Sequence, residues 1–213
     1  MSARDDVLDR IRSALGPEPE VPPIARDYVV ASTLDRALQV ERFAERAAEY
    51  RATVWRCGVD DIAEAVGAAL AEHGAERLVA PGGLPEAWRP YGVEWLEDGR
   101  DAPLGVDELD GADGVVTGCA LAIADTGTLV LDAGPRQGRR ALTLLPDLHV
   151  CVVRSEQVVA TVPEAIRRLG QAVRTGRRPV TFISGPSATS DIELRRVEGV
   201  HGPRRLEIVL ASR

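Results

Sequence analysis

The 213-residue sequence contains no lysine and no asparagine, so arginine is its only strongly basic residue type. A phosphate-binding P-loop, a Schiff-base mechanism and a pyridoxal phosphate anchor each need a lysine amine, and all three are excluded. Codon bias in a GC-rich bacterial genome accounts for this composition together with the many alanines.

Cysteine is also scarce, with three widely separated residues at Cys57, Cys119 and Cys151 and no CxxC spacing. The chain alone therefore lacks the ligands for an iron–sulfur cluster or a structural zinc site, and we predict free, buried thiols. A GxGxxG motif is missing as well, because Gly111, Gly114 and Gly118 have the wrong spacing. We expect no metal or other cofactor to be bound by this chain.

Aromatic residues make up only 4% of the chain, so alanine, valine and leucine must fill most of the core. The net charge of −7 argues against a nucleic-acid partner, which requires a basic face. No apolar run approaches the roughly 20 residues of a membrane span. The segment 1–12 is charged and lacks the apolar centre of a signal peptide, so we expect a cytoplasmic location without a membrane partner.

The first 30 residues differ in character from the remainder of the chain. Ser2 and Asp5 form a capping-box pattern, and apolar residues then recur on one helical face from Val7 to Leu15. The sequence 17–23, PEPEVPP, predicts a stiff linker. We therefore predict an N-terminal arm and linker over 1–30, followed by one α/β domain over 31–213. The apolar stripe of the arm must pack on the core, on a partner or on a second copy.

Helix and strand patterns alternate in the first half of the domain, as in parallel-sheet proteins. Helices are expected over 33–50 and 61–74, and strands over 51–57 and 77–80. The second half is rich in strands and has one clear helix, over 163–174; the segment 141–145 is ambiguous. The strands of that half are expected at 114–117, 121–124, 128–131, 149–154, 180–183 and 206–210. The fold class predicted is α/β, a three-layer sheet with helices on both faces and mixed rather than purely parallel strands.

Three loops rich in small residues are the places where chemistry is most expected. They cover 117–128, 134–140 and 184–191, and the last is expected to open a helix. Small residues let backbone N–H groups approach an anion, and arginine binds carboxylate or phosphate bidentately. The sequence therefore predicts one small-anion site at the carboxyl ends of strands. The predicted ligand-binding residues are Thr117, Thr126, Gly127, Thr128, Arg136, Arg139, Arg140, Gly185, Ser187 and His201.

Each loop also has a purely structural interpretation. The segment 125–128 could be a plain hairpin, the arginines a solvated surface, and 187–191 a helix cap. His149 lies in an apolar strand and is expected to be a hydrogen-bonded core residue. His201, between turn formers, is a better candidate for ligand contact. A triad of Ser187, His201 and Asp191 is disfavoured because nothing marks a nucleophile elbow.

The order and spacing of several motifs resemble the LUD-domain family, and more narrowly its members from bacterial lactate-utilisation systems. The resemblance covers the whole domain, and the arm at 7–15 is also similar. One departure is Asp125, where the family usually has glutamate. The motifs are, in chain order, Thr117-Gly118, Ala122–Leu131, Leu145–His149, Ser184–Ser187 with Asp191–Glu193, and Gly199–Pro203.

This resemblance implies a fold shared with ribose phosphate isomerases and CoA transferases. It also implies that the protein acts with partner proteins that carry iron–sulfur clusters, and that together they oxidise L-lactate to pyruvate. The first hypothesis is thus a component of such a system that binds a small anionic metabolite, such as lactate.

Two alternatives remain open at this point, and with them the question whether the chain is an enzyme. One is a free-standing isomerase- or CoA-transferase-like enzyme; the other is a non-catalytic binding or regulatory module. A transferase would need a carboxylate nucleophile, for which Asp125 and Glu193 are candidates, and His201 is a further weak catalytic candidate.

Overall fold

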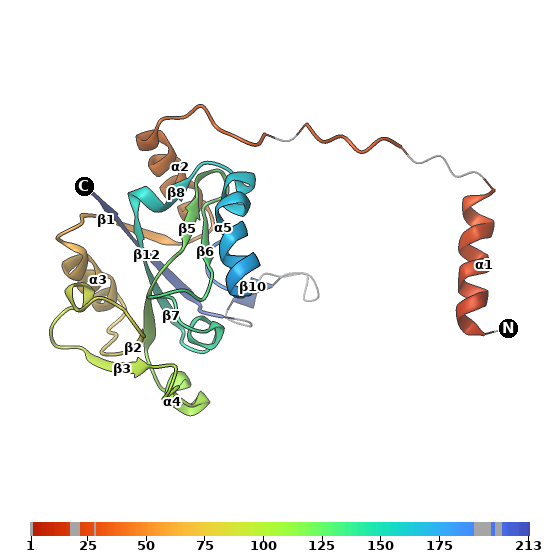
Figure 1. Ribbon diagram of the computed structural model, residues 1–213. Coiled ribbons are helices and arrows are strands. Elements are labelled where there is room, and N and C mark those ends of the chain that lie inside the picture. Colours follow the sequence, from red (N-terminus) through yellow and green to blue (C-terminus); the bar gives the residue numbers. More distant parts are fainter. Residues whose placement is uncertain (1, 18–21, 28, 190–196, 199–201) are drawn as a thin grey trace.

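The computed structural model describes residues 2–17, 22–27, 29–189, 197–198 and 202–213. A six-stranded sheet forms its centre, with the order β1-β12-β7-β4-β2-β3 and every neighbouring pair parallel (Figure 1). The strands are β1 (Thr53–Gly58), β2 (Arg77–Pro81), β3 (Glu94–Asp98), β4 (Gly114–Gly118), β7 (Leu148–Arg154) and β12 (Arg205–Ser212).

The sequence of each strand matches its place in this sheet. The central strands β4, β7 and β12 are continuous, largely apolar runs that are buried on both faces, as expected for parallel strands. The edge strands β1 and β3 are only partly buried. Other elements therefore have to cover both faces of the central strands.

One face of the main sheet packs against α3 (Ile62–Glu72), whose Ile62, Val66, Ala69 and Leu70 join a core cluster with β4, β7 and β12. The other face packs against α2 (Arg36–Glu49) and a second, four-stranded sheet with the order β8-β5-β6-β9. The strands of the second sheet are β5 (Leu121–Ile123), β6 (Thr128–Leu131), β8 (Val158–Val159) and β9 (Thr181–Ile183).

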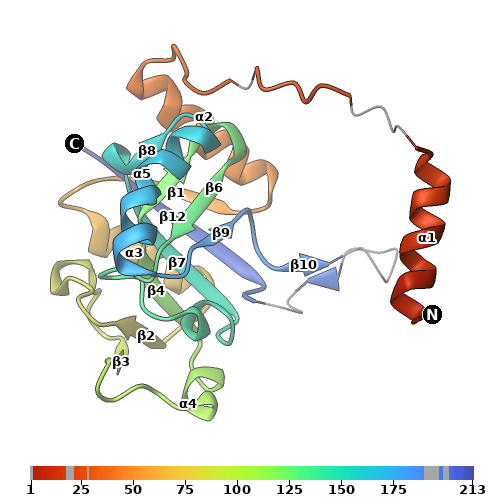
Figure 2. The same cartoon turned by 45° about the vertical axis from the view of Figure 1, so that its right-hand side comes forward.

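The outer face of the second sheet is covered by α5 (Val162–Gly176), which contributes Ala165 and Leu169 to a separate apolar cluster. The predicted α/β class with helices on both faces is thus confirmed, with a second sheet as an additional layer (Figure 2). The mixed strand directions lie in this second sheet, where β5 and β8 are parallel and β6 is antiparallel to its neighbours.

The shorter elements complete the chain. A helix of five residues, α4 (Val106–Asp110), precedes β4, and 3-10 turns cover Glu86–Trp88, Ala124–Thr126, Arg140–Thr143 and Ser155–Gln157. The ambiguous segment at 141–145 thus begins as a 3-10 turn. The expectation that 184–191 opens a helix is wrong at 188–189, where β10 (Ala188–Thr189) pairs antiparallel with β11 (Val197–Glu198).

The arm helix α1 (Ala3–Leu15) lies apart from the body (Figures 1 and 2). Ser2 and Asp5 form the capping box at its start, and none of its residues is buried. Its apolar residues Val7, Ile11 and Leu15 are all about half exposed. The predicted boundary at residue 30 falls in the extended segment between α1 and α2. None of the described helices is long and apolar enough to span a membrane.

Candidate functional site

A cavity of about 230 Å³ opens beside the 3-10 turn at Arg140–Thr143, and we call it the Arg140 pocket. It lies at the amino ends of β7 and β12, since His149 and Leu206 are the second residues of these strands. The sequence analysis predicts the anion site at the carboxyl ends of strands, so this pocket lies at the other end of β7 and β12. The pocket is lined by Arg140, Thr143, His149, Phe182, Ile183, Ser184, Gly185, Pro186, Ser187, Gly202, Pro203 and Leu206.

Arg140 is the cationic group of this pocket. Its Nη1 donates to the carbonyl oxygen of Thr143 at 2.7 Å and to the Thr143 hydroxyl at 2.6 Å, which fixes the guanidinium over the 3-10 turn. Much of the side chain is exposed, yet burial of the guanidinium still lowers the pKa of Arg140. Among the described residues no carboxylate forms an ion pair with it. As far as the described residues go, the pocket therefore offers an anion a positive charge that no carboxylate neutralises.

The hydroxyl group of Ser184 lines the same pocket and connects to two threonine hydroxyls behind it. Ser184 lies 2.8 Å from Thr128, oxygen to oxygen, and Thr128 lies 2.7 Å from Thr126. The backbone N–H of Ser187 donates to the carbonyl oxygen of Pro203 at 2.8 Å, which closes the pocket against β12. Of the predicted residues, Thr126, Thr128, Gly185, Ser187 and Arg140 are thus brought together at or next to the pocket.

Two glycines in these loops allow the backbone of α2 to pack directly against them. Gly127 has φ +59°, and a Cβ there would lie 2.4 Å from the backbone nitrogen of Ala47. Gly185 has φ +79°, and a Cβ there would lie 2.3 Å from the carbonyl oxygen of Tyr50. The hairpin interpretation of 125–128 therefore accounts for Gly127, because the tight turn and the helix contact both require glycine.

His149 forms part of the pocket wall from inside the sheet. It is 1% exposed, and its Nε2 lies 2.8 Å from the hydroxyl oxygen of Thr117. The expected hydrogen-bonded core histidine is thus present, but its place at a cavity was not predicted. Thr117 is fully buried and does not line the pocket, but it contacts His149, which does.

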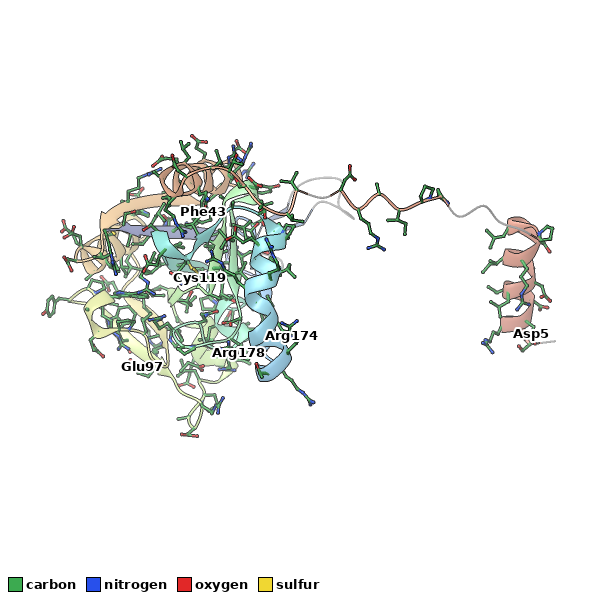
Figure 3. All side chains as sticks on the ribbon, turned by 45° about the horizontal axis from the view of Figure 1, so that its top comes forward. Asp5, Phe43, Glu97, Cys119, Arg174 and Arg178 are labelled. Atoms are coloured by element: carbon green, nitrogen blue, oxygen red, sulfur yellow. The ribbon has the colours of Figure 1, made fainter. Side chains whose placement is uncertain are left out.

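Two buried thiols lie behind His149. Figure 3 labels Cys119 inside the body, and Cys151 follows His149 on the same face of β7. A hydrogen bond from the Cys119 thiol lowers the pKa of Cys151, and His149 and Thr117 act in the same direction. The same contact, together with burial, raises the pKa of Cys119. Cys57 is half-buried, and burial raises its pKa as well. All three cysteines are free.

The side chains of Arg136, Arg139 and Arg140 contact different parts of the structure. Arg136 lies over the ring of Trp88, at 5.9 Å from the ring centroid. Arg139 forms an ion pair with Asp98 at 2.8 Å and lines a separate cavity, so only Arg140 reaches the pocket.

The carboxylate candidates do not line the Arg140 pocket. Asp125 is exposed and forms a 2.9 Å ion pair with Arg42 of α2. Glu193 and His201 lie outside the described residues. Within the described ranges no group of three or more His, Cys, Asp or Glu side chains could hold a metal ion.

Comparisons with known proteins give one consistent result. Residues 106–211 match the model of the LUD domain. The chain is 45% identical to lactate utilization protein C of Deinococcus radiodurans, over 99% of this chain and 96% of that protein. It is 29% identical to lactate utilization protein C of an Exiguobacterium species, over 97% and 95% of the two chains. The crystal structure of a DUF162 family protein from Deinococcus radiodurans is similar, with a TM-score of 0.73 and 42% identity, over 84% of this chain and 99% of that one.

Proposed function

This chain belongs to the LUD-domain family, and from that membership we propose that it is a component of a bacterial L-lactate utilisation system. In this proposal the chain binds a small carboxylate in the Arg140 pocket and acts in the cytoplasm. Two observations support this: the names of its relatives, and a pocket lined by three of the ten predicted ligand residues, Arg140, Gly185 and Ser187.

The observation that carries the ligand class is the guanidinium of Arg140 in a small cavity, where none of the described carboxylates forms an ion pair with it. A volume of about 230 Å³ lies below the roughly 300–1,000 Å³ of pockets for drug-sized ligands, so it suits a molecule of a few heavy atoms. Arginine binds a carboxylate through two parallel hydrogen bonds. Ser184 and His149 add polar groups that could meet a second oxygen of the ligand. Lactate and pyruvate each carry one carboxylate and one further oxygen.

The oxidation step requires a redox centre, because converting lactate to pyruvate removes two electrons. The sequence has no cluster-binding cysteine motif and no dinucleotide-binding motif. We therefore assign the electron transfer to partner proteins with iron–sulfur clusters, and the recognition of a carboxylate to this chain.

A titration of the purified protein with L-lactate, pyruvate and acetate, followed by calorimetry, tests the ligand class. The variant Arg140→Gln should weaken pyruvate or lactate binding at least tenfold, because a charge-assisted pair contributes about 1.5–3 kcal/mol. Arg174→Gln, which removes an exposed arginine of α5, is the matched control and should bind as the parent does. Equal binding by parent and Arg140→Gln would refute the carboxylate site.

A dye-reduction assay with L-lactate tests the division of labour. The protein alone should show no activity, and activity should appear only when iron–sulfur partner proteins are added. Turnover by the isolated protein would instead support the free-standing enzyme. Activity of the partners that does not change when this chain is omitted would refute its role in lactate oxidation.

A further inference from the structure

We propose that the chain has a second ligand site, for an organic phosphate monoester, in a cavity of about 680 Å³ that we call the Arg139 cavity. It lies at the carboxyl ends of β2 and β3 and beside the loop after β6, where open parallel sheets bind ligands. It shares no residue with the Arg140 pocket. Its lining is Gly82, Asp98, Gly99, Arg100, Pro103, Ala133, Gly134, Pro135, Gly138, Arg139 and Arg178.

One side of the cavity holds Arg139 in a fixed position. Asp98, which ends β3 and is 7% exposed, accepts hydrogen bonds from Nε and Nη2 of Arg139 at 2.8–3.2 Å. Nη2 also donates to the carbonyl oxygen of Leu104. The hydrogen bonds to Asp98 raise the pKa of Arg139, and together with the Leu104 contact they use two of its three nitrogens. Nη1 of Arg139 makes no hydrogen bond to any described residue and can donate to a ligand.

Arg178 also lines the cavity and is held by a second buried carboxylate, Asp132. Figure 3 labels Arg178 beside the last turn of α5. Its Nη2 donates to Asp132 at 2.7 Å, and Asp132 also accepts from Gln137 and from the backbone N–H of Gly134. Gly134 packs closely against this pair, because a Cβ there would lie 2.7 Å from Oδ1 of Asp132 and 2.8 Å from Nη1 of Arg178, and these side chains would have to shift to admit it. Nε and Nη1 of Arg178 have no hydrogen-bond partner among the residues that the structure describes, so they can donate to a ligand.

The charge and shape of the cavity select the ligand class. The three arginines Arg100, Arg139 and Arg178 exceed the two buried carboxylates, and both carboxylates already accept several hydrogen bonds. The walls between the arginines are proline, alanine and glycine, which suits an apolar body. The volume lies within the range of small-molecule pockets. A phosphate monoester has a nearly dianionic head with three acceptor oxygens, which matches three guanidinium groups better than a carboxylate does.

Calorimetry with phenyl phosphate as the probe tests this site, with inorganic phosphate, benzoate and phenol in parallel titrations. We expect phenyl phosphate to bind more tightly than each of the other three, because only it has both the dianionic head and the apolar body. Benzoate that binds as tightly as phenyl phosphate would overturn the phosphate assignment. Inorganic phosphate that binds equally well would overturn the role of the apolar walls.

Variants locate the binding and separate it from the Arg140 pocket. Arg178→Gln should weaken phenyl phosphate binding at least tenfold, and Arg100→Gln severalfold, whereas Arg140→Gln should have no effect. Arg178→Gln leaves Asp132 without its ion-pair partner, so its thermal transition is measured alongside. Arg100 is exposed and forms no ion pair with the described carboxylates, so we expect its variant to keep the thermal transition of the parent. Binding that is unchanged in Arg100→Gln, or lost in Arg140→Gln, would overturn the proposal.

Discussion

Replacing Gly127 with alanine tests whether this loop glycine exists for the contact with α2. Two separate effects should lower the free energy of unfolding. The left-handed conformation at φ +59° costs alanine about 1–2 kcal/mol. The new Cβ would lie 2.4 Å from the nitrogen of Ala47 and 2.5 Å from the carbonyl carbon of Arg46, far inside the ordinary contact distance. Displacing a packed helix costs about 1–3 kcal/mol, so the total is about 2–5 kcal/mol.

Gly74 provides a matched control, because it has nearly the same backbone conformation, φ +61°, and nothing within 4 Å of its Cβ position. Gly74→Ala should cost only the conformational part, about 1–2 kcal/mol. Urea denaturation gives the free energy of unfolding of both variants, and the difference between them isolates the helix contact. If Gly127→Ala is no less stable than Gly74→Ala, the contact with α2 does not require the glycine. The hypothesis that the loop backbone binds a ligand would then account for it better.

Four further predictions concern the arm, the thiols and the cofactor content. Deleting residues 1–30 should change the thermal transition of the body little, because α1 buries no side chain and the hydrogen bond lost between Arg167 and the Val30 carbonyl oxygen is exposed, but it should reduce association with partners or a second copy; unchanged oligomeric state and full activity in the dye assay would contradict a docking role. Hydrogen bonds from Ser2 lower the pKa of Asp5 below its usual 3.8, so this contribution to the arm helix is present above pH 3.8 and is lost as the pH falls through the lower value. Hydrogen exchange of the α1 amides at pH 6 and pH 3 checks this, and equal protection would contradict it. A thiol reagent should label the half-exposed Cys57 before the two buried cysteines, as peptide mass spectrometry would show; equal rates would mean that the buried pair is accessible. Elemental analysis and a visible spectrum should show neither stoichiometric iron or zinc nor flavin in the isolated protein, and a flavin band would refute the division of labour.

The helices and central strands could be predicted because their apolar patterns are long and regular. The runs in β4, β7 and β12 leave little choice but a buried parallel strand. The strand β3 was missed because Glu94–Asp98 reads as a polar segment, and it lies at the sheet edge where exposure is tolerated. The separation of the strands into two sheets depends on pairing between distant segments, which local patterns do not encode.

The candidate site was predictable only as a set of loops. Three arginines within five residues looked like one cluster, but the turn at 134–140 sends Arg136 to Trp88, Arg139 to Asp98 and Arg140 to the pocket. His149 was hidden by the apolar strand around it. Glycine supplied an ambiguous signal, because a close approach to a helix and a close approach to a ligand require the same residue.

The position of β12 in the main sheet bears on how the chain can fold. This strand comes after all the others along the chain, yet it lies between β1 and β7. Among the described strands, β12 is the only one that pairs with β1, and Trp55 of β1 hydrogen-bonds Glu207, which lies 152 residues later. Pairings over such separations form slowly, because a long loop must close before any contact is gained. Until Arg205–Ser212 emerges from the ribosome, β1 and β7 both present open edges that can pair with other chains. The nascent chain therefore passes through an aggregation-prone stage that ends only when its last strand inserts.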